Sequence, residues 1–211
     1  MLPIAWNHRP DPMSRLHPAP LARILPIALL WPLAVLAHVE GGAAGGFLSG
    51  VSHPVSGLDH VLAMVAVGLW GAQLGAPAIW LLPVAFPVMM ALGGLLGLSG
   101  VELPAVELGI ALSAVILGAL ILGAIRLPLA AALLVVGFFA VFHGHAHGTE
   151  MTPGQSAILY SIGFVIATGL LHAAGIGIGL IQRWSVGRVA LRGAGAVVMA
   201  GGMFFLWSAL A

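Results

Sequence analysis

The sequence contains no cysteine and no lysine, and few charged side chains of any kind. Without cysteine there is no disulfide, thiolate metal ligand or cysteine nucleophile, so a metal site must use imidazole, carboxylate, thioether or backbone oxygen. Only 6% of the 211 residues are charged and 61% are hydrophobic, whereas soluble domains carry roughly 25% charged residues. The net charge of +1 offers no basic surface to nucleic acid. The composition therefore predicts an integral membrane protein.

The first 37 residues have the pattern of a secretory signal peptide. Three arginines precede a short apolar run, Ile24–Ala37, which is well below the roughly 20 residues of a spanning helix and ends in a small residue. Cleavage after Ala37 would leave His38 as the mature N-terminus. The basic region is long for a signal peptide, and a start at Met13 would give a more ordinary one. An uncleaved anchor helix is the alternative.

Long apolar segments follow a glycine-rich loop at 41–46, and each is long enough to cross a bilayer with some tilt. They cover roughly 47–73, 77–98, 104–125, 128–148, 156–181 and 188–210. The sequence therefore predicts an all-α fold in which residues 38–211 form one domain of six transmembrane helices. After residue 38, arginines fall only at the junctions that follow the third and fifth segments, at 126 and at 183–192. The positive-inside rule makes that side cytoplasmic, so both mature termini are predicted to be periplasmic.

The first apolar segment contains the motif His53-Pro-Val-Ser-Gly-Leu-Asp59-His60. Asp59 and His60 lie near its middle, where a charged side chain costs about 2.5–3.5 kcal/mol and needs a partner, a cation or water. The proline and glycine after His53 predict a break in the helix. Such a break would fold His53 back toward Asp59 and His60.

A second motif, Phe-His-Gly-His-Ala-His-Gly-Thr-Glu, closes the fourth segment at residues 142–150. On a helix His143, His147 and Glu150 share one face, whereas His145 points elsewhere. By the predicted topology these groups and the first motif all lie in the outer half of the membrane, which predicts an outward-facing vestibule. Imidazole and carboxylate without thiolate suit weak, exchangeable binding of Ni²⁺, Co²⁺ or Zn²⁺.

Other ionisable or soft groups are secondary candidates for the metal path. Glu107, near the outer end of the third segment, is either functional or a carboxylate favoured by the helix dipole. His172 lies about 24 Å along the fifth segment. It is either a buried hydrogen-bonded group or a metal-binding station on the inner side of the membrane. Met64, one turn beyond His60, offers a thioether or is plain packing. His38 and Glu40 are candidates for first capture.

The two motifs, continued as HPVSGLDHVLAM (53–64) and FHGHAHGTE (142–150), resemble the signatures of the HupE/UreJ family. Residues 163–179 also resemble the family's fifth helix. The resemblance implies a bacterial inner-membrane nickel permease, possessing a cleaved signal and six helices, that serves hydrogenase or urease maturation. The resemblance implies metal-site roles for residues of both motifs and for the histidine of the fifth helix. Glu107 matches only by its position in the third helix. His145 occupies a variable position. The residues carrying the motif roles are His53, Asp59, His60, His143, His147, Glu150 and His172.

The leading hypothesis is therefore a secondary permease that moves Ni²⁺, or alternatively Co²⁺, from periplasm to cytoplasm. It would hold no permanent cofactor, and its partners would be the lipid bilayer and the divalent ion. A homo-oligomer or a metallochaperone partner stays open. The chain has no nucleotide-binding motif such as GxxxxGK[ST]. A membrane-embedded zinc hydrolase using the same His, Asp and Glu cluster is the alternative. A third hypothesis makes these groups a proton path or a sensor for a partner protein.

Overall fold

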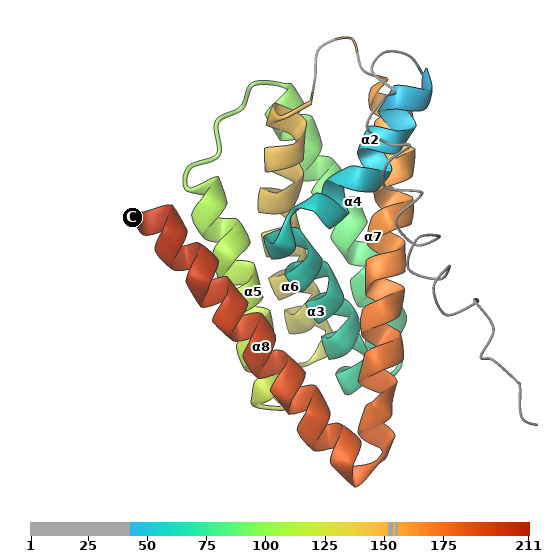
Figure 1. Ribbon diagram of the computed structural model, residues 1–211, viewed down its shortest axis with the longest axis vertical. Helices are drawn as coiled ribbons and strands as arrows, with labels where there is room; N and C mark the ends of the chain where they lie inside the picture. Colours follow the sequence, from blue (N-terminus) through green and yellow to red (C-terminus); the bar gives the residue numbers. More distant parts are fainter. Residues whose placement is uncertain (1–42, 152–153, 155) are drawn as a thin grey trace, which may run out of the picture. The chain divides into compact units, whose positions relative to one another are not determined.

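The computed structural model of the protein describes residues 43–151, 154 and 156–211, and within these residues the regular structure is entirely helical. The predicted signal peptide and His38 lie outside the described residues. The helices, in chain order (Figure 1), are α2 (Ala43–Ser56), α3 (Leu58–Leu74), α4 (Ala78–Leu98), α5 (Val106–Leu122), α6 (Leu129–Thr149), α7 (Ala157–Gly179), the 3₁₀ helix η2 (Leu180–Arg183) and α8 (Ser185–Leu210).

The predicted apolar segments each correspond to helical structure, but two of them differ from a simple spanning helix. The first is broken at Gly57 into α2 and α3, whose axes differ by 81°, so the break expected from the motif's proline and glycine is confirmed. The third is shorter than predicted: α5 ends at Leu122, and Ala124 follows in the left-handed conformation (φ 52°).

Four helices, α4, α6, α7 with η2, and α8, are long and apolar enough to cross a membrane, and the bent α2–α3 pair adds a fifth if it counts as one span. At 17 residues, α5 is only about 26 Å long, less than the roughly 30 Å of a hydrocarbon core. The chain is a multi-pass membrane protein by these criteria, and six spans remain a prediction.

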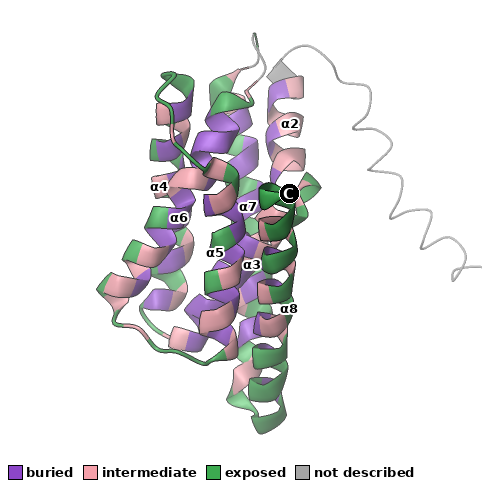
Figure 2. Ribbon diagram, turned by 90° about the vertical axis from the view of Figure 1, so that its left-hand side faces the viewer, coloured by how far each residue is buried: buried purple, intermediate pink, exposed green. Residues whose placement is uncertain are grey.

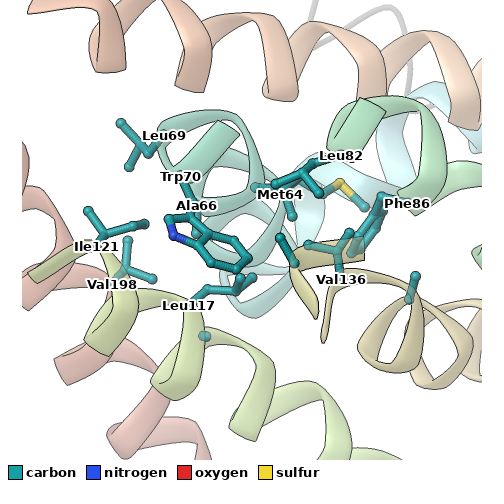
Figure 3. Packing of buried hydrophobic residues seen from close by; sticks show 14 of the residues in the cluster. Met64, Ala66, Leu69, Trp70, Leu82, Phe86, Leu117, Ile121, Val136 and Val198 are labelled. Carbon is teal, nitrogen blue, oxygen red and sulfur yellow. The ribbon is translucent and has the colours of Figure 1, made fainter. Parts of the chain in front are cut away.

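Helix α3 lies at the centre of residues 43–211 and is buried around its whole circumference from Ala63 to Gln73 except at Val65 (Figure 2). Trp70, Phe86 and Leu117, from three different helices, belong to one apolar cluster and have no exposed surface (Figure 3). The indole of Trp70 donates to the Ile125 carbonyl, and the amide of Gln73 donates to the Ile121 carbonyl. These bonds tie α3 to the last turn of α5 and to the residues that follow it.

The most extensive helix pairings are α4 with α6, α5 with α8, α7 with α2 and α7 with α3. Glycines allow the backbones to touch. A Cβ on Gly144 would lie 1.9 Å from the Met90 carbonyl oxygen, and one on Gly118 would lie 2.4 Å from the Met199 nitrogen. Small residues bring membrane helices together in this way because lipid supplies no hydrophobic drive for their association.

Large apolar side chains cover the outward faces of the helices. Several of them are more than 65% exposed, among them Trp80, Leu134, Ile158, Val186 and Trp207. A contiguous apolar exterior of this kind suits contact with lipid and not with water.

Candidate metal site

The bend at Gly57 brings two parts of the first motif to the same place. Gly57 is extended (φ −99°, ψ 117°) and precedes the first turn of α3. A Cβ there would come within 2.7 Å of Asp59 Oδ1 and 3.1 Å of His60 Nδ1, so a side chain would crowd the pair. Glycine therefore makes room for Asp59 and His60 at the start of α3, while His53 remains on α2.

The last two turns of α6 face this bend. His143 and His147 are 0% and 5% exposed. The ring centroids of His53 and His147 lie 4.6 Å apart, those of His147 and His60 4.7 Å, and those of His60 and His143 4.8 Å. The four imidazoles therefore form a continuous row, in the order His53, His147, His60, His143, which we call the imidazole row.

The row reaches solvent at the His53 end. Glu150 caps α6, and its Oε2 lies 3.3 Å from His53 Nε2; the two side chains are 55% and 30% exposed. His53, His147 and Glu150 each offer one ligand atom, and these atoms lie within 4.8 Å of one another. We call these residues the three-ligand group. Two imidazoles and a carboxylate at such spacing could hold a divalent transition metal.

Hydrogen bonds fix which nitrogen of His60 is available. Asp59 Oδ1 accepts from the backbone N–H and from the ring Nδ1 of His60, both at 2.9 Å. Because a carboxylate only accepts, Nδ1 carries the proton and Nε2 keeps its lone pair. Carboxylates orient metal-binding histidines in the same way. Asp59 therefore acts on the row through His60.

Ser113 of α5 fixes His143 in a similar manner. Its hydroxyl donates to the Ile110 carbonyl at 2.6 Å, and its oxygen lies 3.0 Å from His143 Nε2. Because the single hydroxyl hydrogen is used, Nε2 must donate to Ser113 and Nδ1 keeps its lone pair. Neither this Nδ1, nor His60 Nε2, nor either nitrogen of His147 has a hydrogen-bond partner among the described residues. Buried nitrogens of this kind are suited to binding a metal ion.

The sequence model of the family described as "HupE / UreJ protein" matches residues 26–205. "Protein HupE" from Rhizobium leguminosarum bv. viciae is 46% identical over 175 residues, which cover 82% of this chain and 91% of the relative. No solved structure matches.

The chain belongs to the HupE/UreJ family. The family resemblance seen in the two motifs is thereby confirmed. HupE/UreJ proteins are transporter-type accessory proteins related to nickel and cobalt transport. The matched region contains both motifs and all four rings of the imidazole row.

The other residues predicted for the metal path of this HupE/UreJ protein lie outside the imidazole row. Glu107, in the first turn of α5, lines a cavity of about 260 Å³ together with Asp59 and the end of α8. Met64 is fully buried in the apolar core. His145 donates through Nε2 to the Val101 carbonyl at 2.7 Å, so it ties α6 to the α4–α5 connection and does not join the row. His172 lies deeper, on α7.

Sequence reasoning did not single out Ser113 or Phe86, which both contact His143. Ser113 had a recognisable signal, because it is the one polar side chain in α5 besides Glu107. A lone hydroxyl in an apolar spanning segment requires a partner. Phe86 had no such signal, since a phenylalanine among apolar residues is ordinary packing.

Replacing Ser113 by alanine is expected to lower the affinity of the protein for Ni²⁺ about tenfold, the lower range for loss of an orienting partner of a metal-binding histidine. The alanine leaves His143 free to adopt the other tautomer. Threonine at this position keeps the hydroxyl and should restore most of the affinity. Isothermal titration of the purified variants measures both effects. Equal affinity for Ser113→Ala and wild type would show that the Ser113–His143 bond does not matter for binding.

Proposed function

We propose that this protein is a secondary permease for a divalent transition metal, Ni²⁺ in the first place and Co²⁺ in the second. The observation that carries the proposal is the imidazole row, with its unpartnered nitrogens and one end at solvent beside Glu150. A series of neighbouring weak sites lets an ion move from one to the next, as passage requires. Family membership supports the same cargo.

The distribution of charge supports uptake toward the cytoplasm. Four arginines lie at or near the junctions between α5 and α6 and between α7 and α8: Arg126, Arg183, Arg188 and Arg192. Glu150 lies at the opposite end of α6. With the arginines cytoplasmic, the three-ligand group faces the periplasm of a bacterial inner membrane. The proposal includes six spans, with α2–α3 as one bent span and α5 as a short one, and a cleaved signal peptide over residues 1–37. It also places both mature termini in the periplasm.

The membrane potential is sufficient to drive the process. Moving two charges inward is favoured by about 4.6 kcal/mol per 100 mV. A nucleotide-hydrolysing subunit is therefore not required by the energetics. The other proposed partners are lipid, the ion itself, and a second copy of the chain or a metallochaperone that receives the metal. The imported metal would serve hydrogenase or urease maturation, as implied by the family.

Flux into proteoliposomes tests the proposal. Purified protein in vesicles with a negative interior should accumulate Ni²⁺ faster than empty vesicles. Binding needs neutral imidazole, and a metal ion has to displace any proton that a ring holds. The initial rate should therefore fall, and not rise, as the external pH is lowered.

Two outcomes would contradict this function. Accumulation no faster than in empty vesicles would exclude a permease. The three-ligand group also has the composition of a hydrolytic zinc site, so a stoichiometric zinc that resists chelators, without any flux, would instead favour the zinc hydrolase.

A further inference from the structure

One face of α7 continues beyond the imidazole row. Its buried residues Tyr160, Phe164, Thr168 and His172 follow one another at four-residue spacing, so they lie on one face. The first two contact the row: the Phe164 ring lies 4.5 Å from that of His147, and Tyr160 lies 5.9 Å from His53. From Phe164 to His172 the helix advances about 12 Å. The same face therefore leads from the row toward the arginine end of the helices.

The polar groups on this deeper part of the face are buried without partners. His172 is 1% exposed and Thr168 is 0% exposed. Neither ring nitrogen of His172 nor the Thr168 hydroxyl has a hydrogen-bond partner in the described part of the chain. Threonine in a helix normally bonds back to its own backbone, as Thr149 does. Three unsatisfied polar atoms on adjacent turns are costly, and such groups require an explanation.

A single aromatic ring separates His172 from the imidazole row. The Phe86 centroid lies 5.5 Å from that of His143 and 5.4 Å from that of His172. Phe86 is fully buried, in the same cluster as Met64 (Figure 3). An ion that leaves His143 therefore has to pass one phenyl ring to reach His172.

Helix α4 lacks one backbone hydrogen bond beside His172. Because residue 87 is proline, the Pro83 carbonyl lacks its usual helical donor. The backbone of Pro83 lies near the His172 ring, although among the described residues no bond of normal geometry joins them. The α3 and α7 backbones also touch here, since a Cβ on Gly68 would lie 2.2 Å from the His172 carbonyl oxygen. An imidazole, a hydroxyl and a free carbonyl are thus gathered between three closely packed helices.

We propose that His172 and Thr168 form a second metal-binding station, which takes Ni²⁺ or a similar divalent transition metal from the imidazole row past Phe86. The inference deepens the proposed permease function and rests on it. One imidazole with neutral oxygen donors and no carboxylate binds more weakly than the row does. A weaker station on the far side favours release of the ion.

The test separates binding from passage. His172→Leu and His172→Gln are compared with wild type for equilibrium Ni²⁺ binding in detergent and for Ni²⁺ flux into proteoliposomes. Loss of a metal ligand typically costs tenfold or more, so the initial flux should fall about tenfold while the affinity of the row changes less than about twofold. Thr168→Val, which removes only the hydroxyl, should lower the flux about threefold, within the range for one lost hydrogen-bonding group.

The matched control is His145→Gln, which removes an equally buried histidine outside the path. It should keep the wild-type flux. Size-exclusion profiles identify any variant that fails to fold, and the glutamine variant then replaces the leucine one. Wild-type flux in both folded His172 variants would overturn the second station and leave the permease standing. Loss of equilibrium binding together with flux would also overturn it, since His172 would then belong to the row. Absence of flux in the wild type would overturn the permease itself.

Discussion

His147→Ala is expected to reduce nickel uptake about 100-fold, the upper range for loss of a partner that merely orients a metal ligand. His147 is the ring that joins the two parts of the row, because its centroid lies within 5 Å of both His53 and His60. It also belongs to the three-ligand group that reaches solvent. Its removal both weakens capture and interrupts the path. The measurement is radioactive nickel uptake in cells that lack other nickel carriers, at matched membrane abundance.

The chain supplies a close control for this experiment. His145 lies two residues away on α6 and is similarly buried, at 6% against 5%, but its ring bonds to the Val101 carbonyl. His145→Gln should keep uptake within about twofold of wild type, because the amide can still donate to a carbonyl. His60→Ala and Glu150→Gln should behave like His147→Ala. Normal uptake in all three would remove the row from the mechanism.

Gly144→Ala is expected to destabilise the fold by about 2 kcal/mol, within the range for overpacking of a close contact. A Cβ at this position would lie 1.9 Å from the Met90 carbonyl oxygen, and similar contacts at Gly93 and Gly148 join the C-terminal halves of α4 and α6. Because the contacts are between backbones, an added methyl group can be accommodated only if the two helices move apart. Thermal unfolding of the purified protein in detergent should show a lower midpoint, and membrane abundance should fall several-fold.

Gly169→Ala on α7 is the matched control for Gly144→Ala. A Cβ at Gly169 would meet nothing within 4 Å, and alanine is the better helix former. This variant should therefore match or exceed the wild-type midpoint. Equal midpoints for Gly144→Ala and Gly169→Ala would contradict the view that backbone contact holds α4 and α6 together.

The sequence predicted the helical character of the chain and the approximate limits of each apolar segment, because hydropathy reports directly on burial in lipid. It also predicted the break before Asp59, since proline and glycine weaken a helix in any environment. It did not predict that α5 ends at Leu122. The left-handed residue at 124 is an alanine, a residue that gives no sign of a helix end.

The candidate site was less accessible to sequence reasoning. Helical spacing predicted that His143 and His147 share a face, but not which helix each of them meets. Helices that are apolar on all sides carry no periodic signal for their rotation, so the contact of His143 with Ser113 and Phe86 had to come from the packing. Gly93 and Gly97, spaced four residues apart as small residues at membrane-helix contacts often are, both approach the backbone of α6 between Val141 and Thr149.

The spacing of the imidazole row also limits how many ions it can hold. Two dications at neighbouring rings about 4.7 Å apart would repel each other by about 14 kcal/mol, even at an effective dielectric constant near 20. Two ions therefore cannot occupy neighbouring rings of the row at the same time. A second ion arriving at Glu150 lowers the retention of the first, and mutual repulsion becomes part of what moves the cargo inward. Occupancy of the row would then saturate as a single site although four rings line it.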